Sequence, residues 1–200
     1  EAEHESDWGW GLGRAQYPEI TLNERAVTDQ AKAADVAVFT ITRQAGEGWD
    51  RSAGGDKGFN LTADEQQLLE RVSDKFHKEG KKVIVVINSG SVINTSSWKG
   101  LVDGILLAWQ PGEEAGHCVA DIVTGKVNPS GKLPMTWPND LMDHPSSKQF
   151  PTTAPDNDKV CRYKEGINVG YRYFETAGKA VSYPFGYGLS YTTFSYRDLK

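Results

Sequence analysis

The stretch KKVIVVINSG places five consecutive apolar residues, Val83 to Ile87, between two lysines and a polar turn. An apolar run without polar alternation is typical of a strand that is covered on both faces, as in a parallel sheet. Two further runs, at residues 35–42 (DVAVFTIT) and 103–109 (DGILLAW), have the same character. The chain is therefore expected to build a mainly parallel sheet with helices on its faces.

Helices are predicted before, between and after these strands. Asn23 is a suitable N-cap for a helix over NERAVTDQAKAAD, and the residues TADE at 62–65 have the spacing of a capping box that opens a helix over 62–79. A third helix is predicted over EEAGHCVADIVTG, with two acids in its first turn and Gly125 just past its end. Alternating strands and helices of this kind indicate an open α/β fold.

The predicted fold class is a three-layer α/β/α sandwich with a mainly parallel sheet, followed by a long irregular C-terminal region. Six of the nine prolines fall within residues 128–160, so residues 126–200 are expected to be a largely irregular and β-rich tail. Its aromatic end is expected to form hairpins or to pack on a neighbour. Residues 1–22 are interpreted as an irregular N-terminal segment ahead of one domain at 23–200.

Charge and composition argue against several classes of function. The chain has 22 basic and 27 acidic residues, a formal net charge of −5 and no long basic run, so neither nucleic acid nor a membrane surface is an expected partner. No apolar run approaches the roughly 20 residues that cross a bilayer. The histidines are scattered and no Cys/His ligand spacing occurs, so no metal and no cofactor is expected. Cys118 and Cys161 are interpreted either as unpaired thiols or as a disulfide.

The strand at 35–42 leads into RQAGEGWDR at residues 43–51, which sets the carboxylate of Glu47 between two glycines. Neither neighbour has a side chain that would block a ligand, and ligands of open α/β sheets bind at the carboxyl ends of strands. Burial against Trp49, or a second acid nearby, would raise the pKa of Glu47 and suit it to act as a general acid. Glu47 is therefore a candidate catalytic residue.

Structural interpretations of the same loop stay open. Glu47 could pair with Arg43 or Arg51 or cap a turn, and Asp50 and Arg51 are expected to pair with each other or to brace the loop. Glycoside hydrolysis requires two carboxylates, roughly 5 Å apart for retention or about 6.5–9.5 Å apart for inversion. Asp50, three residues from Glu47, could supply the second carboxylate only if the loop folds back on itself. Phosphate-binding and serine-hydrolase motifs are not matched, because INSGS and GWGLG fit neither GxGxxG nor GxSxG.

Several segments together resemble the C-terminal α/β sandwich domain of glycoside hydrolase family 3, the β-glucosidase and β-xylosidase family. They are AKAADVAVFTITRQAGEGWDR, LTADEQQLLERV, VIVVINSGSVI, GILLAWQPGEEAGHCVADIVTGKVNPSGKLPMTWP and YKEGINVGYRYFETAGKAVSYPFGYGLSYTTF. The resemblance covers about residues 24–196. In that family an N-terminal (β/α)8-like barrel supplies an aspartate nucleophile, and the second domain supplies an acid/base glutamate from a GEG loop. That motif falls on Gly46-Glu47-Gly48.

The resemblance implies that this chain is the acid/base-bearing domain of a retaining, exo-acting β-glycosidase, with β-glucosidase as the first choice. Terminal β-linked glucosides or xylosides are the implied substrates, Glu47 the acid/base, Trp49 a sugar contact, and Asp50 and Arg51 the loop support. A periplasmic or extracellular location is implied by the family alone. The alternative is a non-catalytic α/β carbohydrate-binding or interaction module.

The chain contains no barrel, and it is interpreted as a piece of a longer protein. Ser6-Asp7-Trp8 is similar to the family's nucleophile motif, but it follows a polar segment and lies only 40 residues before Glu47. We therefore discount it and expect the nucleophile in a separate barrel domain. The 200 residues alone are expected to be inactive.

Overall fold

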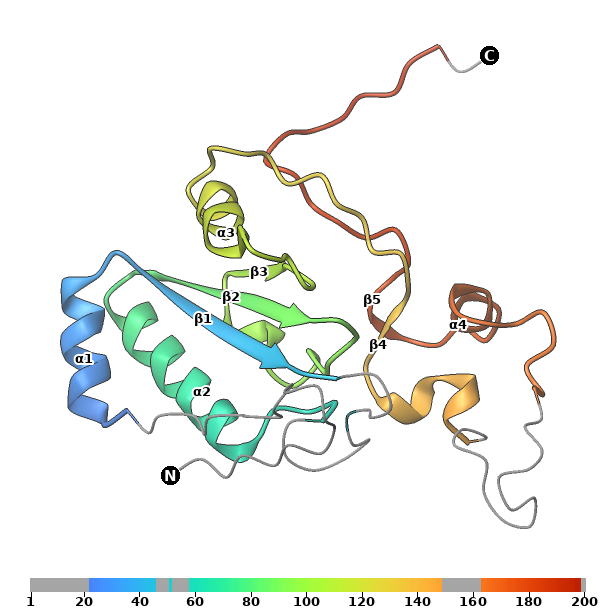
Figure 1. Ribbon diagram of the computed structural model, residues 1–200, viewed down its shortest axis with the longest axis horizontal. Helices are drawn as coiled ribbons and strands as arrows, with labels where there is room; N and C mark the ends of the chain where they lie inside the picture. Colours follow the sequence, from blue (N-terminus) through green and yellow to red (C-terminus); the bar gives the residue numbers. More distant parts are fainter. Residues whose placement is uncertain (1–21, 46–50, 52–57, 149–162, 199–200) are drawn as a thin grey trace.

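The computed structural model describes residues 22–45, 51, 58–148 and 163–198 (Figure 1). Along the chain the elements are α1 (Glu24–Ala33), β1 (Val36–Arg43), α2 (Ala63–Lys78), β2 (Lys82–Ser89), η1 (Lys99–Leu101), β3 (Gly104–Leu107), α3 (Ala115–Val123), β4 (Trp137–Pro138), η2 (Leu141–Asp143), η3 (Pro145–Lys148), α4 (Tyr171–Thr176) and β5 (Val181–Tyr183), where η marks a 3-10 helix. The chain is therefore a mixed α/β protein.

The main sheet consists of β1, β2 and β3, which are parallel and adjacent in that order. Arg43 pairs with Ser89 at the end of β1, and Ile87 pairs with Leu107 further along the sheet. The parallel sheet predicted from the three apolar runs is thus confirmed. Because the strands run the same way, their carboxyl ends open onto one edge, where the loops that follow them begin.

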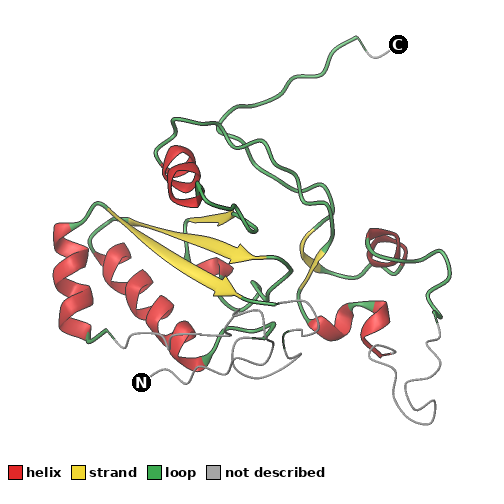
Figure 2. Ribbon diagram, in the orientation of Figure 1, coloured by secondary structure: helices red, strands yellow, loops and turns green. Residues whose placement is uncertain are grey.

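Helices lie on both sides of this sheet, with α1 and α2 together on one side and α3 on the other (Figure 2). The α2 side holds the main core, formed by the buried side chains Ala31, Phe39, Ile41, Leu68, Leu69, Phe76, Val83, Val85 and Ile87. Val85 and Val86 are neighbours that point to opposite faces of β2, and both are buried. The central strand is therefore covered on both faces, as its unbroken apolar run predicts.

Both predicted helix starts on the α2 side are confirmed. The Asn23 side chain accepts a hydrogen bond from the Ala26 amide at 2.8 Å. Thr62 and Glu65 form the full capping box, since each side chain accepts from the other residue's amide, at 3.1 and 2.8 Å. These bonds satisfy amides that a helix leaves unpaired in its first turn.

The start of α3 was predicted too early. The helix begins at Ala115, so no acid lies in its first turn, and Glu114 is the N-cap residue without making a side-chain cap bond. The Glu114 carboxylate lies 2.6 Å from Nδ1 of His117 instead. Gly125 does follow the helix end, in the left-handed conformation with φ of 76°.

Of the two expectations for the aromatic C-terminal end, hairpins are not formed within the described residues 163–198, and packing on a neighbour stays a prediction. β5 pairs antiparallel with β4, so that Tyr183 faces Trp137 from a distant part of the chain. Residues Tyr171–Thr176 form the helix α4, where Phe174 is buried and makes an edge contact with His144. Aromatic residues favour strands in general, but burial of Phe174 decides this segment. Much of the remaining tail is irregular, as expected.

The two cysteines and the helix lengths bear on the remaining expectations. Cys118 on α3 is an exposed free thiol, and Cys161 lies outside the described residues. Among the described residues, no helix combines the length and the apolar character that a membrane span requires.

Candidate functional site

The structure places only part of the predicted site. Glu47, Trp49 and Asp50 lie outside the described residues, as do Ser6 to Trp8, whereas Arg51 is described. We call the described residues that hold this loop the frame; it consists of Arg43 on one side, Gly58 on the other and Arg51 between them, together with their partners.

Arg43 is the last residue of β1, and the alternation of the strand turns its side chain inward. Ala37, Phe39, Ile41 and Arg43 are buried, while the residues between them are exposed. Only 4% of Arg43 is exposed to solvent. An arginine carried inward by a two-residue period needs acceptors inside the protein, because a buried charge without partners is strongly unfavourable.

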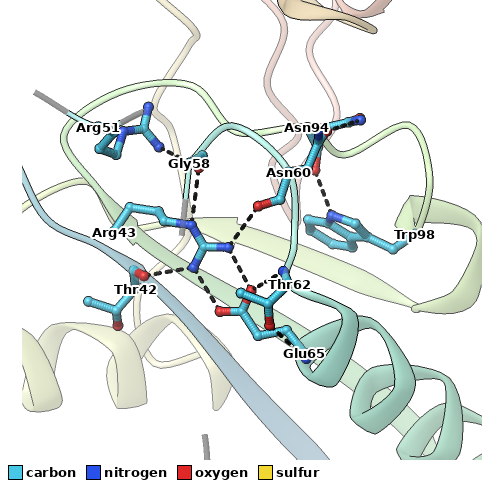
Figure 3. Close-up of polar contacts among 9 residues, drawn as sticks. All are labelled: Thr42, Arg43, Arg51, Gly58, Asn60, Thr62, Glu65, Asn94 and Trp98. Carbon is cyan, nitrogen blue, oxygen red and sulfur yellow. Dashed lines mark hydrogen bonds and ion pairs between the residues drawn. The ribbon is translucent and has the colours of Figure 1, made fainter. Parts of the chain in front are cut away.

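Figure 3 shows how those acceptors surround the guanidinium. Nη1 donates to the Thr42 carbonyl and to Oε1 of Glu65, both at 2.8 Å. Nη2 donates to the Asn60 carbonyl at 3.1 Å and to Oε2 of Glu65 at 2.7 Å, and Nε donates to the Gly58 carbonyl at 3.3 Å. Each of the five guanidinium N–H donors of Arg43 thus has an acceptor among the described residues.

Glu65 serves two purposes at once. Its carboxylate caps α2 by accepting from the Thr62 amide, and it forms a two-pronged ion pair with Arg43. The side chains of Arg43 and Glu65 are 1% and 12% exposed. Glu65 is therefore committed to the frame and is not available as a second catalytic carboxylate.

Arg51 connects the loop after β1 to the loop after β2. Its Nη2 donates to Oγ of Ser91 at 2.5 Å and to the Val92 carbonyl at 2.7 Å, and its Nη1 donates to the Gly58 carbonyl at 3.4 Å. The Asn94 side chain also donates to Oδ1 of Asn60 at 2.9 Å. Two loops that are separate in sequence thus form one hydrogen-bonded unit.

The loop after β2 is itself held in place by buried groups. The hydroxyl of Ser89 donates to the Ser91 carbonyl at 2.7 Å, and Ser89 is only 1% exposed. Further along, the indole N–H groups of Trp98 and Trp137 donate to the carbonyls of Asn94 and Ile93, each at 2.6 Å. Ser91 and Val92 therefore offer Arg51 firmly placed acceptors.

The third loop, after β3, meets the second at Gly90. A Cβ atom on Gly90 would lie 3.0 Å from the amide group of the Gln110 side chain, so the two loops approach closely here. Next to Gln110, Trp109 has a φ of 55°, a left-handed conformation that costs a bulky residue about 1–3 kcal/mol. Trp109 also packs against Trp137, with ring centres 6.2 Å apart. The three strand-end loops are therefore in contact.

A cavity of about 640 Å³ lies away from this frame, between β3 and the segments 129–133 and 187–191. Its lining is mostly apolar, and the one acid among its described lining residues is Asp103. Asp103 is bound by Lys82, His77 and the Val83 amide. The cavity therefore lacks the pair of carboxylates that glycoside hydrolysis needs.

No group of three or more His, Cys, Asp or Glu side chains within the described ranges is arranged to hold a metal ion. The frame supplies instead fixed guanidinium groups and a carboxylate that is already paired. What it can do chemically is to hold the segment between Arg43 and Gly58 at the sheet edge.

Sequence reasoning missed the pairing of Arg43 with Glu65 and the role of Ser91. The sequence carried no clear signal for Arg43, because β1 is a largely apolar run and its alternation appears only in the burial of its side chains. Glu65 was identified as part of the capping box, but nothing local shows a second partner 22 residues away. Ser91 carried no local signal, since its contact with Arg51 joins residues 40 positions apart.

Comparison with known proteins gives the family of this chain. Residues 5–191 match the family model of the glycosyl hydrolase family 3 C-terminal domain. Beta-glucosidase A of Butyrivibrio fibrisolvens is 40% identical over 216 residues, which cover 95% of this chain and 25% of that protein. An exo-alpha-(1->6)-L-arabinopyranosidase of Bifidobacterium longum is 39% identical over 174 residues, 86% of this chain and 21% of that protein.

A solved structure agrees with these matches. Beta-glucosidase 3B from Thermotoga neapolitana, in complex with glucose, superimposes with a TM-score of 0.88 at 51% sequence identity. The match covers 93% of this chain and 26% of that one. The chain thus spans about a quarter, or less, of the length of the relatives it matches.

Proposed function

This chain belongs to glycoside hydrolase family 3 as its C-terminal domain, and from that premise we propose that it carries the acid/base residue of a retaining, exo-acting β-glycosidase. Glu47 is the proposed acid/base. The nucleophilic aspartate is assigned to an N-terminal (β/α)8 barrel domain, which together with this chain makes up what we call the complete enzyme.

The observation that carries the proposal is the place of the GEG motif at Gly46-Glu47-Gly48. It follows β1 directly at the carboxyl edge of the parallel sheet, between Arg43 and Arg51, whose contacts anchor that edge. An acid/base residue that acts on a sugar bound to another domain must be carried by a loop with fixed ends, because its distance from the sugar has to be right.

In the proposed reaction Glu47 acts twice. As an acid it protonates the oxygen of the leaving group while the barrel aspartate attacks the anomeric carbon, which gives a covalent glycosyl-enzyme. As a base it then removes a proton from the water that releases the sugar with retained configuration. Trp49 is proposed to contact the sugar ring, and Asp50 to support the loop.

Terminal β-linked glucosides are the proposed substrates, because the relatives include several β-glucosidases. Because the arabinopyranosidase from Bifidobacterium longum is 39% identical to this chain, a terminal pentopyranoside is the second candidate substrate. β-Xylosides belong to the same pentopyranoside class. A periplasmic or extracellular location is proposed from the family resemblance.

The test compares the complete enzyme with its Glu47→Ala variant on aryl β-glucosides with good and poor leaving groups, with and without azide. Loss of a proton donor should lower kcat/KM, which reports on formation of the glycosyl-enzyme, by an order of 10²–10⁴-fold for poor leaving groups and much less for good ones. With good leaving groups, loss of the base should instead lower kcat, because the glycosyl-enzyme is then hydrolysed slowly. Azide should restore turnover of good substrates, because it attacks the glycosyl-enzyme without needing a base. Glu79→Ala, at an exposed carboxylate on the end of α2, is the control.

Equal behaviour of Glu47→Ala and the parent enzyme on all substrates would refute the assignment. The chain by itself should show no turnover, because the nucleophile is assigned to the barrel. An inactive complete enzyme that still binds sugars would favour the alternative, a non-catalytic carbohydrate-binding module.

A further inference from the structure

We propose that Ser91 and Arg51 form a positioning pair for Glu47, through which the loop after β2 sets the geometry of the loop after β1. This inference rests on the proposed function, because it takes Glu47 as the acid/base. Neither residue of the pair is proposed to touch the substrate.

The pair fixes a point in the middle of the loop as well as its ends. Arg43 holds the beginning and the end of the loop by donating to the carbonyls of Gly58 and Asn60. Arg51 adds an attachment between those ends, with 2.5 and 2.7 Å bonds to Oγ of Ser91 and the Val92 carbonyl. A loop divided by such an attachment has less conformational freedom than one held only at its ends.

Glu47 lies four residues after Arg43 and four residues before Arg51. Only four residues therefore link each arginine to the acid, and a segment of four residues spans at most about 14 Å when fully extended. A change at either anchor is therefore transmitted to the acid over only a few bonds. Displacement of a catalytic group by about 1 Å can cost on the order of 100-fold in rate.

The acceptor side of the pair is rigid, which is what a positioning role requires. Ser91 is tied to the buried Ser89 by a 2.7 Å bond from the Ser89 hydroxyl to the Ser91 carbonyl. The neighbouring Ile93 is fully buried, and its carbonyl accepts from the Trp137 indole. Arg51 is therefore attached to the core, and not to another mobile surface group.

A lysine cannot reproduce these contacts. The guanidinium of Arg51 reaches Ser91, Val92 and Gly58 from two nitrogens in a fixed planar arrangement, whereas an ammonium group offers one nitrogen on a flexible stem. Charge alone would be kept by Arg51→Lys, but geometry would not. This variant consequently separates an effect of position from an effect of charge.

The experiment uses the complete enzyme and the variants Ser91→Ala, Arg51→Met and Arg51→Lys, each made with Glu47 present and with Glu47→Ala. Kinetics are measured on aryl β-glucosides with good and poor leaving groups. Ser97→Ala, at an exposed position of the same loop, and Arg25→Met, at a 91% exposed side chain, are the matched controls. Thermal unfolding of every variant is recorded alongside.

With Glu47 present, Arg51→Met should lower kcat/KM on poor leaving groups by about 10- to 100-fold, with a smaller loss of kcat/KM on good ones. Arg51→Lys should recover only part of this loss, and Ser91→Ala should show a weaker effect of the same kind. In the Glu47→Ala background none of the three should cause a further loss, because residues that act through one another are not additive. The controls should match the parent enzyme.

The positioning role would be overturned if kcat/KM fell equally for all leaving groups. It would also be overturned if the loss of kcat/KM multiplied with the loss from Glu47→Ala. Either result would leave the proposed function intact. Full recovery by Arg51→Lys would overturn it as well. The proposed function fails separately, when Glu47→Ala itself shows no dependence on the leaving group. If Arg51→Met does not fold, Ser91→Ala decides the matter, because it changes only one hydroxyl outside the loop.

Discussion

Arg43 and Glu65 face each other in a two-pronged ion pair, with Nη1 2.8 Å from Oε1 and Nη2 2.7 Å from Oε2. The pair joins the end of β1 to the first turn of α2, and the loop that contains Glu47 leaves and returns on either side of it. Its geometry is the one in which arginine binds a carboxylate most specifically. The pair therefore closes the base of the proposed acid/base loop.

Replacing Glu65 by Gln should destabilise the chain on the order of 3 kcal/mol, because it leaves the buried Arg43 without its counter-charge. The measurement is the free energy of unfolding in urea, followed by circular dichroism. Glu70→Gln, on an exposed turn of the same helix, is the control and should change the value by less than about 0.5 kcal/mol. Equal losses in the two variants would contradict the importance of the pair.

Asp103 should stabilise the chain in a pH-dependent way. The hydrogen bond from Lys82, followed by that from the Val83 amide, lowers the pKa of Asp103 well below its ordinary value near 3.8. A carboxyl whose folded pKa is depressed contributes stability above its unfolded pKa, and this contribution is lost as the pH falls toward the folded value. Asp103→Asn should therefore cost about 1–2 kcal/mol at pH 7.

The measurement for Asp103 is urea unfolding of both proteins from pH 7 down to pH 3. The gap between them should stay constant to about pH 5 and narrow at lower pH. Asp35→Asn, at an exposed position, should show no comparable gap. A gap that widens on acidification would refute the assignment of the sign.

Gly188→Ala should destabilise the tail by about 1–3 kcal/mol, because the new methyl group would collide with the carbonyl oxygen of Gly131. The two segments cannot separate easily, since Leu133 is hydrogen-bonded to both Tyr187 and Gly186. Gly116→Ala on α3 is the control: nothing lies within 4 Å of its new methyl group, so stability should stay equal or rise by up to about 1 kcal/mol. Thermal midpoints that shift in the same direction would contradict this packing.

Much of the fold was predictable because its signals are local. The apolar runs at 35–42 and from Val83 to Ile87 reflect which segments meet the core, and both strands form as expected. The caps at Asn23 and Thr62 need only residues within one turn. The helix α4 was missed because aromatic residues favour strands in general, whereas burial of Phe174 in this helix is a tertiary contact.

The sequence by itself thus determined the parallel sheet, the starts of α1 and α2, the family and the place of the GEG motif after a strand. Only the tertiary structure decided that Arg43 pairs with Glu65, that Arg51 binds Ser91, and that β4 pairs with β5. The physical reason is the range of the interactions: periodicity and capping act between near neighbours, whereas these contacts join residues that are 22, 40 and more positions apart. Such partners are brought together only when the layers pack.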